Sequence, residues 1–217
     1  MKTWLTKLWK ENRTFILFIL LMFMFRSAIA DWNQVPTGSM KPTILIGDRI
    51  LVNKMAYDIR IPFTHISLYR LSDPKRGDIV IFDSTVSDKR LVKRVVGLPG
   101  DQVALDHNVL IINGERMSYQ PERSSPAGLD EMENLFGVEH LIRVNDHNQS
   151  YLSSFSPVVV PQGHYLVLGD NRDNSADSRI IGFVPRNEIV GRARRVVMSL
   201  DYDNYYLPRS GRFFDRL

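Results

Sequence analysis

The chain has 217 residues, 44% of them hydrophobic and 24% charged, an ordinary globular composition that excludes wholesale disorder and a fibrous repeat. It has no cysteine, which excludes disulfides, thiolate metal sites and a cysteine nucleophile. The net charge is +4, but residues 1–13 hold four cations and one anion and so supply three of those charges. The remaining chain is nearly neutral, so we expect no nucleic-acid partner.

An apolar run from Phe15 to Phe25 follows this basic flank. As a helix the run alone covers about 17 Å, and its extension to Trp32 reaches about 27 Å, close to the ~30 Å of a bilayer core. Because cations flank the run on its N-terminal side, the N-terminus is expected in the cytoplasm and the rest outside it. The sequence therefore predicts a cytoplasmic basic flank at 1–13 and one transmembrane helix at 14–32.

A cleavable signal peptide is the alternative for the same segment, since Ala28-Ile29-Ala30 before Asp31 has the form of a cleavage site. Arg26, between the apolar run and that site, fits this alternative less well. Both alternatives export everything downstream.

Short apolar runs separated by turn residues replace helical periodicity after residue 32, which predicts an all-β, antiparallel domain over residues 33–217. Asn113-Gly114 after one of these runs is a strong hairpin signal, because both turn positions need a positive φ. Residues 115–160 are more polar and irregular and are interpreted as a possible inserted lobe. The predicted strands are residues 44–46, 49–54, 78–82, 91–96, 102–106, 109–112, 165–168 and 189–198.

Three segments carry candidate chemistry. Ser39 lies in a Gly- and Pro-bounded turn that exposes it, although such a serine is usually only a turn residue. Strand alternation places Lys93 on one face with Leu91 and Val95, so an inward face would bury the amine and lower its pKa towards the range that a general base needs. The alternative is that Lys93 faces solvent.

The third segment, residues 169–179, concentrates short polar side chains after an apolar strand. It lacks the sixth-position glycine and twelfth-position glutamate of a calcium loop, so no metal is expected there. A plain surface loop is the alternative.

Together these segments resemble the type I signal peptidases, membrane-anchored endopeptidases with a Ser–Lys dyad that remove signal peptides from exported proteins. The resemblance covers essentially the whole chain, and in that family the N-terminal segment is retained as an anchor in the bacterial cytoplasmic membrane. Its boxes correspond here to Pro-Thr-Gly-Ser-Met-Lys-Pro-Thr-Ile (36–44), Gly-Asp-Arg-Ile-Leu-Val-Asn-Lys (47–54), Lys-Arg-Val-Val-Gly-Leu-Pro-Gly-Asp (93–101) and Gly-Asp-Asn-Arg-Asp-Asn-Ser-Ala-Asp-Ser-Arg (169–179).

The resemblance implies roles for individual residues. Ser39 is the expected nucleophile and Lys93 its base, without cofactor or metal. The oxyanion hole is formed by the Ser39 N–H and the hydroxyl of Thr37, where the family more often has serine. Supporting positions are Ser175, which orients the lysine, and Arg94, Asp177 and Arg179, which stabilise the site; the candidate pocket walls are Val35, Ile44, Leu91 and Val92.

The expected substrates are exported preproteins with small residues, Ala-X-Ala, before the scissile bond, and the other expected partner is membrane lipid. A monomer is expected. Two alternatives stay open: another Ser–Lys processing peptidase, such as one acting on conjugation pilin, or a non-catalytic exported β-rich binding protein.

Overall fold

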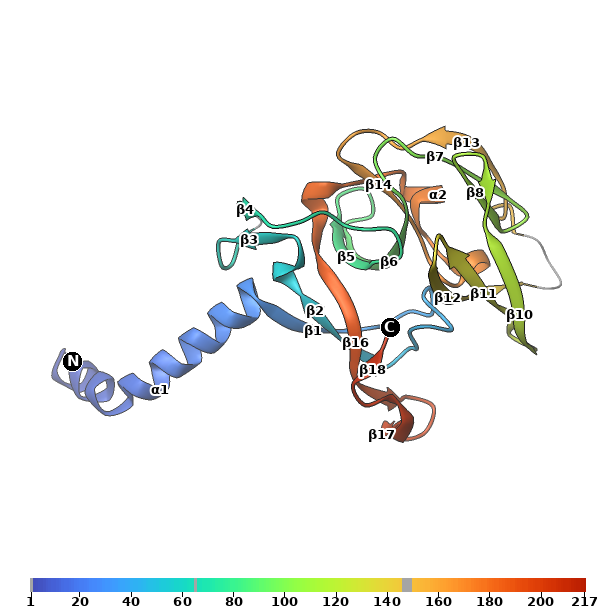
Figure 1. Ribbon diagram of the computed structural model, residues 1–217. Helices are drawn as coiled ribbons and strands as arrows, with labels where there is room; N and C mark the ends of the chain where they lie inside the picture. Colours follow the sequence, from blue (N-terminus) through green and yellow to red (C-terminus); the bar gives the residue numbers. More distant parts are fainter. Residues whose placement is uncertain (1, 65, 146–149) are drawn as a thin grey trace.

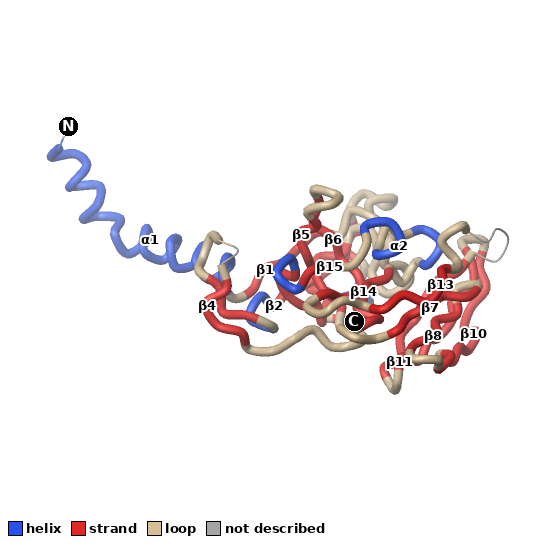
Figure 2. Tube along the Cα trace, turned by 90° about the horizontal axis from the view of Figure 1, so that it is seen from above, coloured by secondary structure: helices blue, strands red, loops and turns tan. Residues whose placement is uncertain are grey.

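The computed structural model describes residues 2–64, 66–145 and 150–217, and it shows a long N-terminal helix projecting from a β-rich body (Figures 1 and 2). Helix α1 spans Lys2–Ala28, and strand β1 (Ala30–Gln34) follows it after one residue. The last residues of the predicted transmembrane segment are therefore strand. Apolar side chains in the second half of α1 are exposed, for example Phe15 at 65% and Leu21 at 64%. Within the described ranges, no helix combines the length and the apolar character needed to cross a membrane.

The main sheet has the order β1-β2-β16-β5-β6-β14-β15, and every neighbouring pair is antiparallel, as the sequence predicts. Strand β16 also pairs with β17 and β18. Strand β6, which carries Lys93, lies inside the sheet between β5 and β14. The strand bounds are β2 Asp48–Asn53, β5 Ile79–Ser84, β6 Lys89–Gly97, β14 His164–Leu168, β15 Val184–Pro185, β16 Ile189–Asp201, β17 Leu207–Pro208 and β18 Asp215–Arg216.

Every predicted strand but one is a strand in the structure. The exception is residues 44–46, which form a turn: the N–H of Ile44 donates to the carbonyl of Met40 (2.8 Å), and the N–H of Leu45 donates to the Asp48 carboxylate (2.8 Å). An apolar run this short carries no period of its own, so the flanking turn chemistry decides its conformation. The predicted hairpin is confirmed, with φ of 53° at Asn113 and 83° at Gly114.

The strands between Gln102 and Val159 form two smaller sheets beside the main one (Figure 1). The predicted irregular stretch 115–160 therefore contains regular strands. The sequence hides them because β10 is largely exposed and shows no apolar alternation. One sheet has the order β13-β7-β8-β9 (Phe155–Val159, Gln102–Asp106, Val109–Ile112, Glu115–Arg116), and the other has β10-β11-β12 (Ser118–Ser125, Gly128–Leu135, Val138–Val144).

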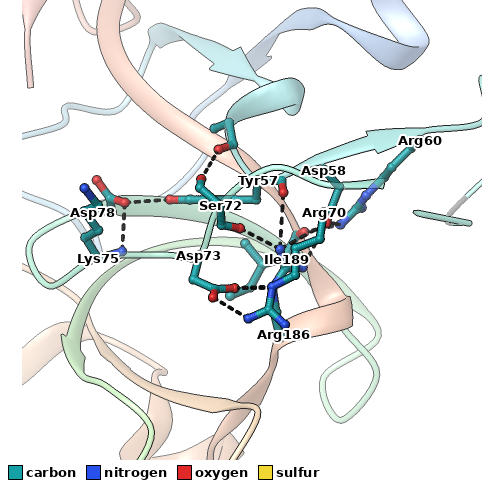
Figure 3. Close-up of polar contacts among 11 residues, drawn as sticks. Tyr57, Asp58, Arg60, Arg70, Ser72, Asp73, Lys75, Asp78, Arg186 and Ile189 are labelled. Atoms are coloured by element: carbon teal, nitrogen blue, oxygen red, sulfur yellow. Dashed lines mark hydrogen bonds and ion pairs between the residues drawn. The ribbon is translucent and has the colours of Figure 1, made fainter. Parts of the chain in front are cut away.

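A separate hairpin, β3 (Asp58–Arg60) and β4 (Ser67–Arg70), is fastened to the body by Arg186 (Figure 3). The Arg186 guanidinium contacts the Asp58 carboxylate at 3.0 Å and that of Asp73 at 2.7 Å. Burial by itself raises the pKa of Asp58, but hydrogen bonds from Arg186 and Arg60 outweigh it and lower that pKa. The short helices are η1 (Lys54–Ala56), η2 (Arg172–Asn174), α2 (Ser178–Ile181), η3 (Arg186–Glu188) and η4 (Ser210–Arg212).

Candidate active site

The candidate nucleophile lies in a loop that two different anchors hold in place. On one side Met40, next to Ser39, is 1% exposed and packs in the core with Val35 and Ile44. On the other side Asn171 donates through its backbone N–H to the carbonyl of Ser39 (3.1 Å) and through its side chain to the carbonyl of Gly38 (2.9 Å). These contacts hold the backbone around Ser39 in place, while Ser39 itself stays half-buried.

Lys93 brings an amine to this loop from the interior of the main sheet. Its strand neighbours Leu91 and Val95 pack in one core cluster, and Lys93 itself is 2% exposed. Lys93 Nζ lies 2.8 Å from Ser39 Oγ and 3.0 Å from the carbonyl oxygen of Val92. Residues distant in the sequence therefore form a direct hydrogen bond.

Burial changes the acid–base chemistry of this amine. Desolvation lowers the pKa of Lys93 to about 8, while the negative charges of Asp177 and Asp170 act in the opposite direction. At pH 7 about a tenth of the amine is then uncharged, far more than for an ordinary lysine, and an uncharged amine in contact with a hydroxyl can accept its proton. The pair has the geometry of an activated nucleophile without a histidine or a carboxylate.

The polar segment 169–179 packs directly against the pair. Gly169 makes this possible, since a Cβ there would overlap Ser175 Oγ and lie 2.5 Å from the carbonyl oxygen of Ser39. Ser175 is 5% exposed, and its hydroxyl has no hydrogen-bond partner among the residues that the structure describes. The structure therefore brings Ser175 beside the nucleophile loop but gives it no hydrogen bond to Lys93.

Two buried ion pairs hold this segment in shape. The guanidinium of Arg94 binds the Asp170 carboxylate through two contacts of 2.8 and 2.7 Å, and Arg179 binds Asp177 with 2.7 Å contacts. Asp177 also accepts a hydrogen bond from the N–H of Gly169 (2.9 Å). Sequence reasoning placed Arg94, Asp177 and Arg179 near the site but missed Asp170 as the partner of Arg94.

A further buried cluster, which the sequence did not indicate, joins the segment to the three-stranded sheet. Arg172, 1% exposed, places its guanidinium 2.5 Å from the carboxylate of Glu133, a fully buried residue of β11. The same carboxylate accepts a hydrogen bond from Tyr119 (2.5 Å) and lies 3.0 Å from His140 Nε2. Burial raises the pKa of Glu133, but Arg172 and His140 outweigh it and hold that pKa far below its usual range.

A groove of about 590 Å³ opens onto the Ser39–Lys93 pair. Three of the four predicted wall residues, Val35, Leu91 and Val92, line it, and so does Thr37. Ile44 does not: it is fully buried and packs in the core beneath the loop. No group of side chains in the described ranges has the arrangement of a metal site.

A serine that contacts a buried amine at the edge of a groove is the kind of site that a serine peptidase with a lysine base requires. A model of the family described as "Signal peptidase, peptidase S26" matches residues 8–198. The signal peptidase I of Pseudomonas aeruginosa is 37% identical over 87% of this chain and 72% of its own length. That of Pseudomonas fluorescens is 39% identical with the same coverage.

Among solved structures, a signal peptidase I from Enterococcus faecalis is 30% identical, covers 56% of this chain and 97% of its own, and has a TM-score of 0.37. On the family match and the Pseudomonas relatives, the chain belongs to the S26 signal peptidase family and is a serine peptidase.

Proposed function

We propose that this chain is a membrane-bound endopeptidase that removes signal peptides from exported preproteins, with Ser39 as nucleophile and neutral Lys93 as general base. The observation that carries the proposal is the 2.8 Å contact between Ser39 Oγ and an amine that is 2% exposed and has a pKa of about 8. The similarity to proteins named signal peptidase I supports the choice of substrate.

In the proposed reaction Lys93 takes the proton of Ser39 while the hydroxyl oxygen attacks the scissile carbonyl carbon. The N–H of Ser39 and the hydroxyl of Thr37 stabilise the resulting oxyanion. The Lys93 ammonium then protonates the leaving amine, which releases the mature protein and leaves the signal peptide esterified to Ser39. Water activated by the same amine hydrolyses that ester. Ser175 is proposed to orient the amine during these transfers.

The proposed preference for Ala-X-Ala rests on the apolar walls of the groove. Val35, Leu91 and Val92 line the cavity beside the pair, and we propose that they leave space only for small side chains. Larger side chains would clash with these walls, so selection works by exclusion.

Residues 14–32 are the proposed membrane attachment, with the N-terminus in the cytoplasm and the catalytic domain outside. The exposed apolar side chains of α1 and the basic flank before them support this orientation.

The test is a cleavage assay with the purified, detergent-solubilised chain and an exported precursor carrying an Ala-X-Ala site. The wild type is expected to release the mature protein, whereas Ser39→Ala and Lys93→Met are expected to release none. Ser118→Ala and Lys75→Met make the same changes at exposed positions and should cleave like the wild type. Thr37→Val should lose about 10²–10³-fold in turnover, the usual effect of removing one oxyanion donor. A wild type that leaves the precursor intact, or an active Lys93→Met, would refute the proposal.

A further inference from the structure

A second cavity, of about 490 Å³, borders the nucleophile loop. Ser39 lines the groove described above, and its neighbour Gly38 lines this second cavity. Consecutive Cα atoms are about 3.8 Å apart, so the two cavities border the same short piece of loop. A peptide whose scissile bond lies at Ser39 therefore needs only a few residues to reach from one cavity to the other.

The two cavities differ in chemistry. The walls of the first include Val35, Leu91 and Val92, whereas the second is bounded largely by polar side chains, among them Lys41, Arg143 and Asn171. A precursor has the same asymmetry about its scissile bond, since small apolar residues precede the bond and the start of a water-soluble protein follows it. The polar cavity thus matches the residues that follow the scissile bond, and the first groove matches those that precede it.

Of the three charged side chains that line this cavity, Arg143 alone has an ion pair among the described residues, whereas Lys41 and Asp173 have none. Arg143 binds Asp130 through contacts of 2.6 and 2.8 Å. Asp173 accepts hydrogen bonds from the backbone of Asn145 (2.8 Å) and the side chain of Asn108 (3.0 Å). The Lys41 ammonium has neither an ion pair nor a hydrogen bond within residues 2–64, 66–145 and 150–217.

Lys41 is also held close to the nucleophile loop. A Cβ at Gly38 would lie 3.3 Å from both Cδ and Cε of Lys41, so the aliphatic stem lies over the glycine. This arrangement confines the position of the ammonium, and a confined, unpaired cation attracts an anion more effectively than a freely moving one.

We propose that this cavity binds the residues that follow the scissile bond, and that Lys41 selects an acidic side chain among them. The proposal rests on the proposed function, because it concerns the substrate of the same site. It adds a specificity determinant on the mature side of the bond.

The test uses precursors that share one Ala-X-Ala signal and carry Asp, Asn or Lys at the first, second or third position after the bond. We expect the wild type to cleave an Asp precursor with a kcat/KM about fivefold above that of its Asn counterpart at one or more of these positions, the scale of a partly exposed ion pair. In Lys41→Gln the Asp and Asn precursors should be equal. In Lys41→Glu the preference should move to Lys. High salt should weaken each preference.

Lys75→Glu is the matched control: it makes the same charge change at an exposed lysine that lines neither cavity, and it should keep the wild-type preference. Cleavage of the Asn precursors shows that a variant is folded and active. If the wild type cleaves the Asn precursors but shows no charge preference, or if Lys41→Glu keeps the wild-type preference, the Lys41 proposal is overturned and the proposed function stands. If the wild type cleaves no precursor, both fall together.

Discussion

The proposed chemistry depends on the amine of Lys93, and the fold lowers the pKa of this amine by keeping water away from it. Strand β6 carries it inside the sheet, and its exposure is 2%. Burial disfavours the charged form, which is why the pKa falls from the usual 10.5 to about 8. The same burial that supplies the proposed base also costs folding free energy, because the charged amine is poorly solvated there.

The pH dependence of cleavage should report this lowered pKa. Because neutral Lys93 is the proposed active form, kcat/KM should rise with pH through a midpoint near 8 rather than near 10.5. Initial rates at low precursor concentration between pH 6 and 11 give the profile. A rising limb centred near 10.5 would show that the base is a hydrated lysine.

Stability should depend on pH through the same group. Between about pH 8 and 10.5 the folded state holds Lys93 neutral while the unfolded chain keeps it protonated. The unfolded state then binds more protons, so the free energy of unfolding rises with pH, by about 3 kcal/mol over the window. Lys93→Met should lack this rise. Urea unfolding of both proteins from pH 7 to 11 measures the difference, and curves that stay parallel would contradict it.

Segment 169–179 is held against the nucleophile loop by shape as well as by charge, and Gly169 provides the close approach. An alanine there would place its Cβ against Ser175 Oγ and the Ser39 carbonyl, so one of them must move. We expect Gly169→Ala to lower kcat by at least about tenfold, since small displacements of reacting groups have large kinetic costs. Gly211→Ala is the control, because a Cβ there meets nothing within 4 Å. Equal rates for both variants would show that the contact is unimportant.

The β10–β12 sheet contributes to the site through the buried Glu133–Arg172 pair. Glu133→Gln leaves the Arg172 charge buried without its counter-ion and should lower the free energy of unfolding by about 3–5 kcal/mol. Replacing both residues by methionine should cost much less. Arg116→Ala, which breaks an exposed pair with Asp106, should change little. Urea unfolding at pH 7 compares them, and a double variant less stable than Glu133→Gln would argue against this explanation.

At the scale of the whole molecule, the exposed apolar half of α1 should decide whether the chain associates with lipid. Leu20→Arg with Phe23→Arg puts two charges into that run, and each costs about 2.5–3.5 kcal/mol at the centre of a bilayer. We expect the wild type to float with phospholipid vesicles in a density gradient and the double variant to stay in the soluble fraction. Val86→Arg with Tyr151→Arg adds the same charge at exposed apolar positions of the body and should float. A floating Leu20/Phe23 variant would exclude this helix as the attachment.

The sequence predicts the sheet well and the polar lobe poorly, for a physical reason. Strands such as β5 and β14 are buried on both faces and read as apolar runs, whereas β10 is mostly exposed and carries no pattern. In the same way, the alternation around Lys93 indicates that it can be buried. Long-range pairs such as Arg94–Asp170 and Glu133–Arg172 leave no local trace, because their partners meet only after distant strands have assembled.

The junction of α1 and β1 has one more consequence. Only Ile29 separates the two elements, and the amine of Lys54 donates hydrogen bonds to the carbonyl oxygens of Arg26 and Ser27 at the helix end. Residues of β1 also line the groove beside Ser39. Helix α1 and the strand that lines the groove are therefore joined by a single residue. If α1 lies in a bilayer, this short connection limits the distance and orientation of the groove relative to the membrane. The enzyme would then cleave each precursor at a set distance from the membrane surface.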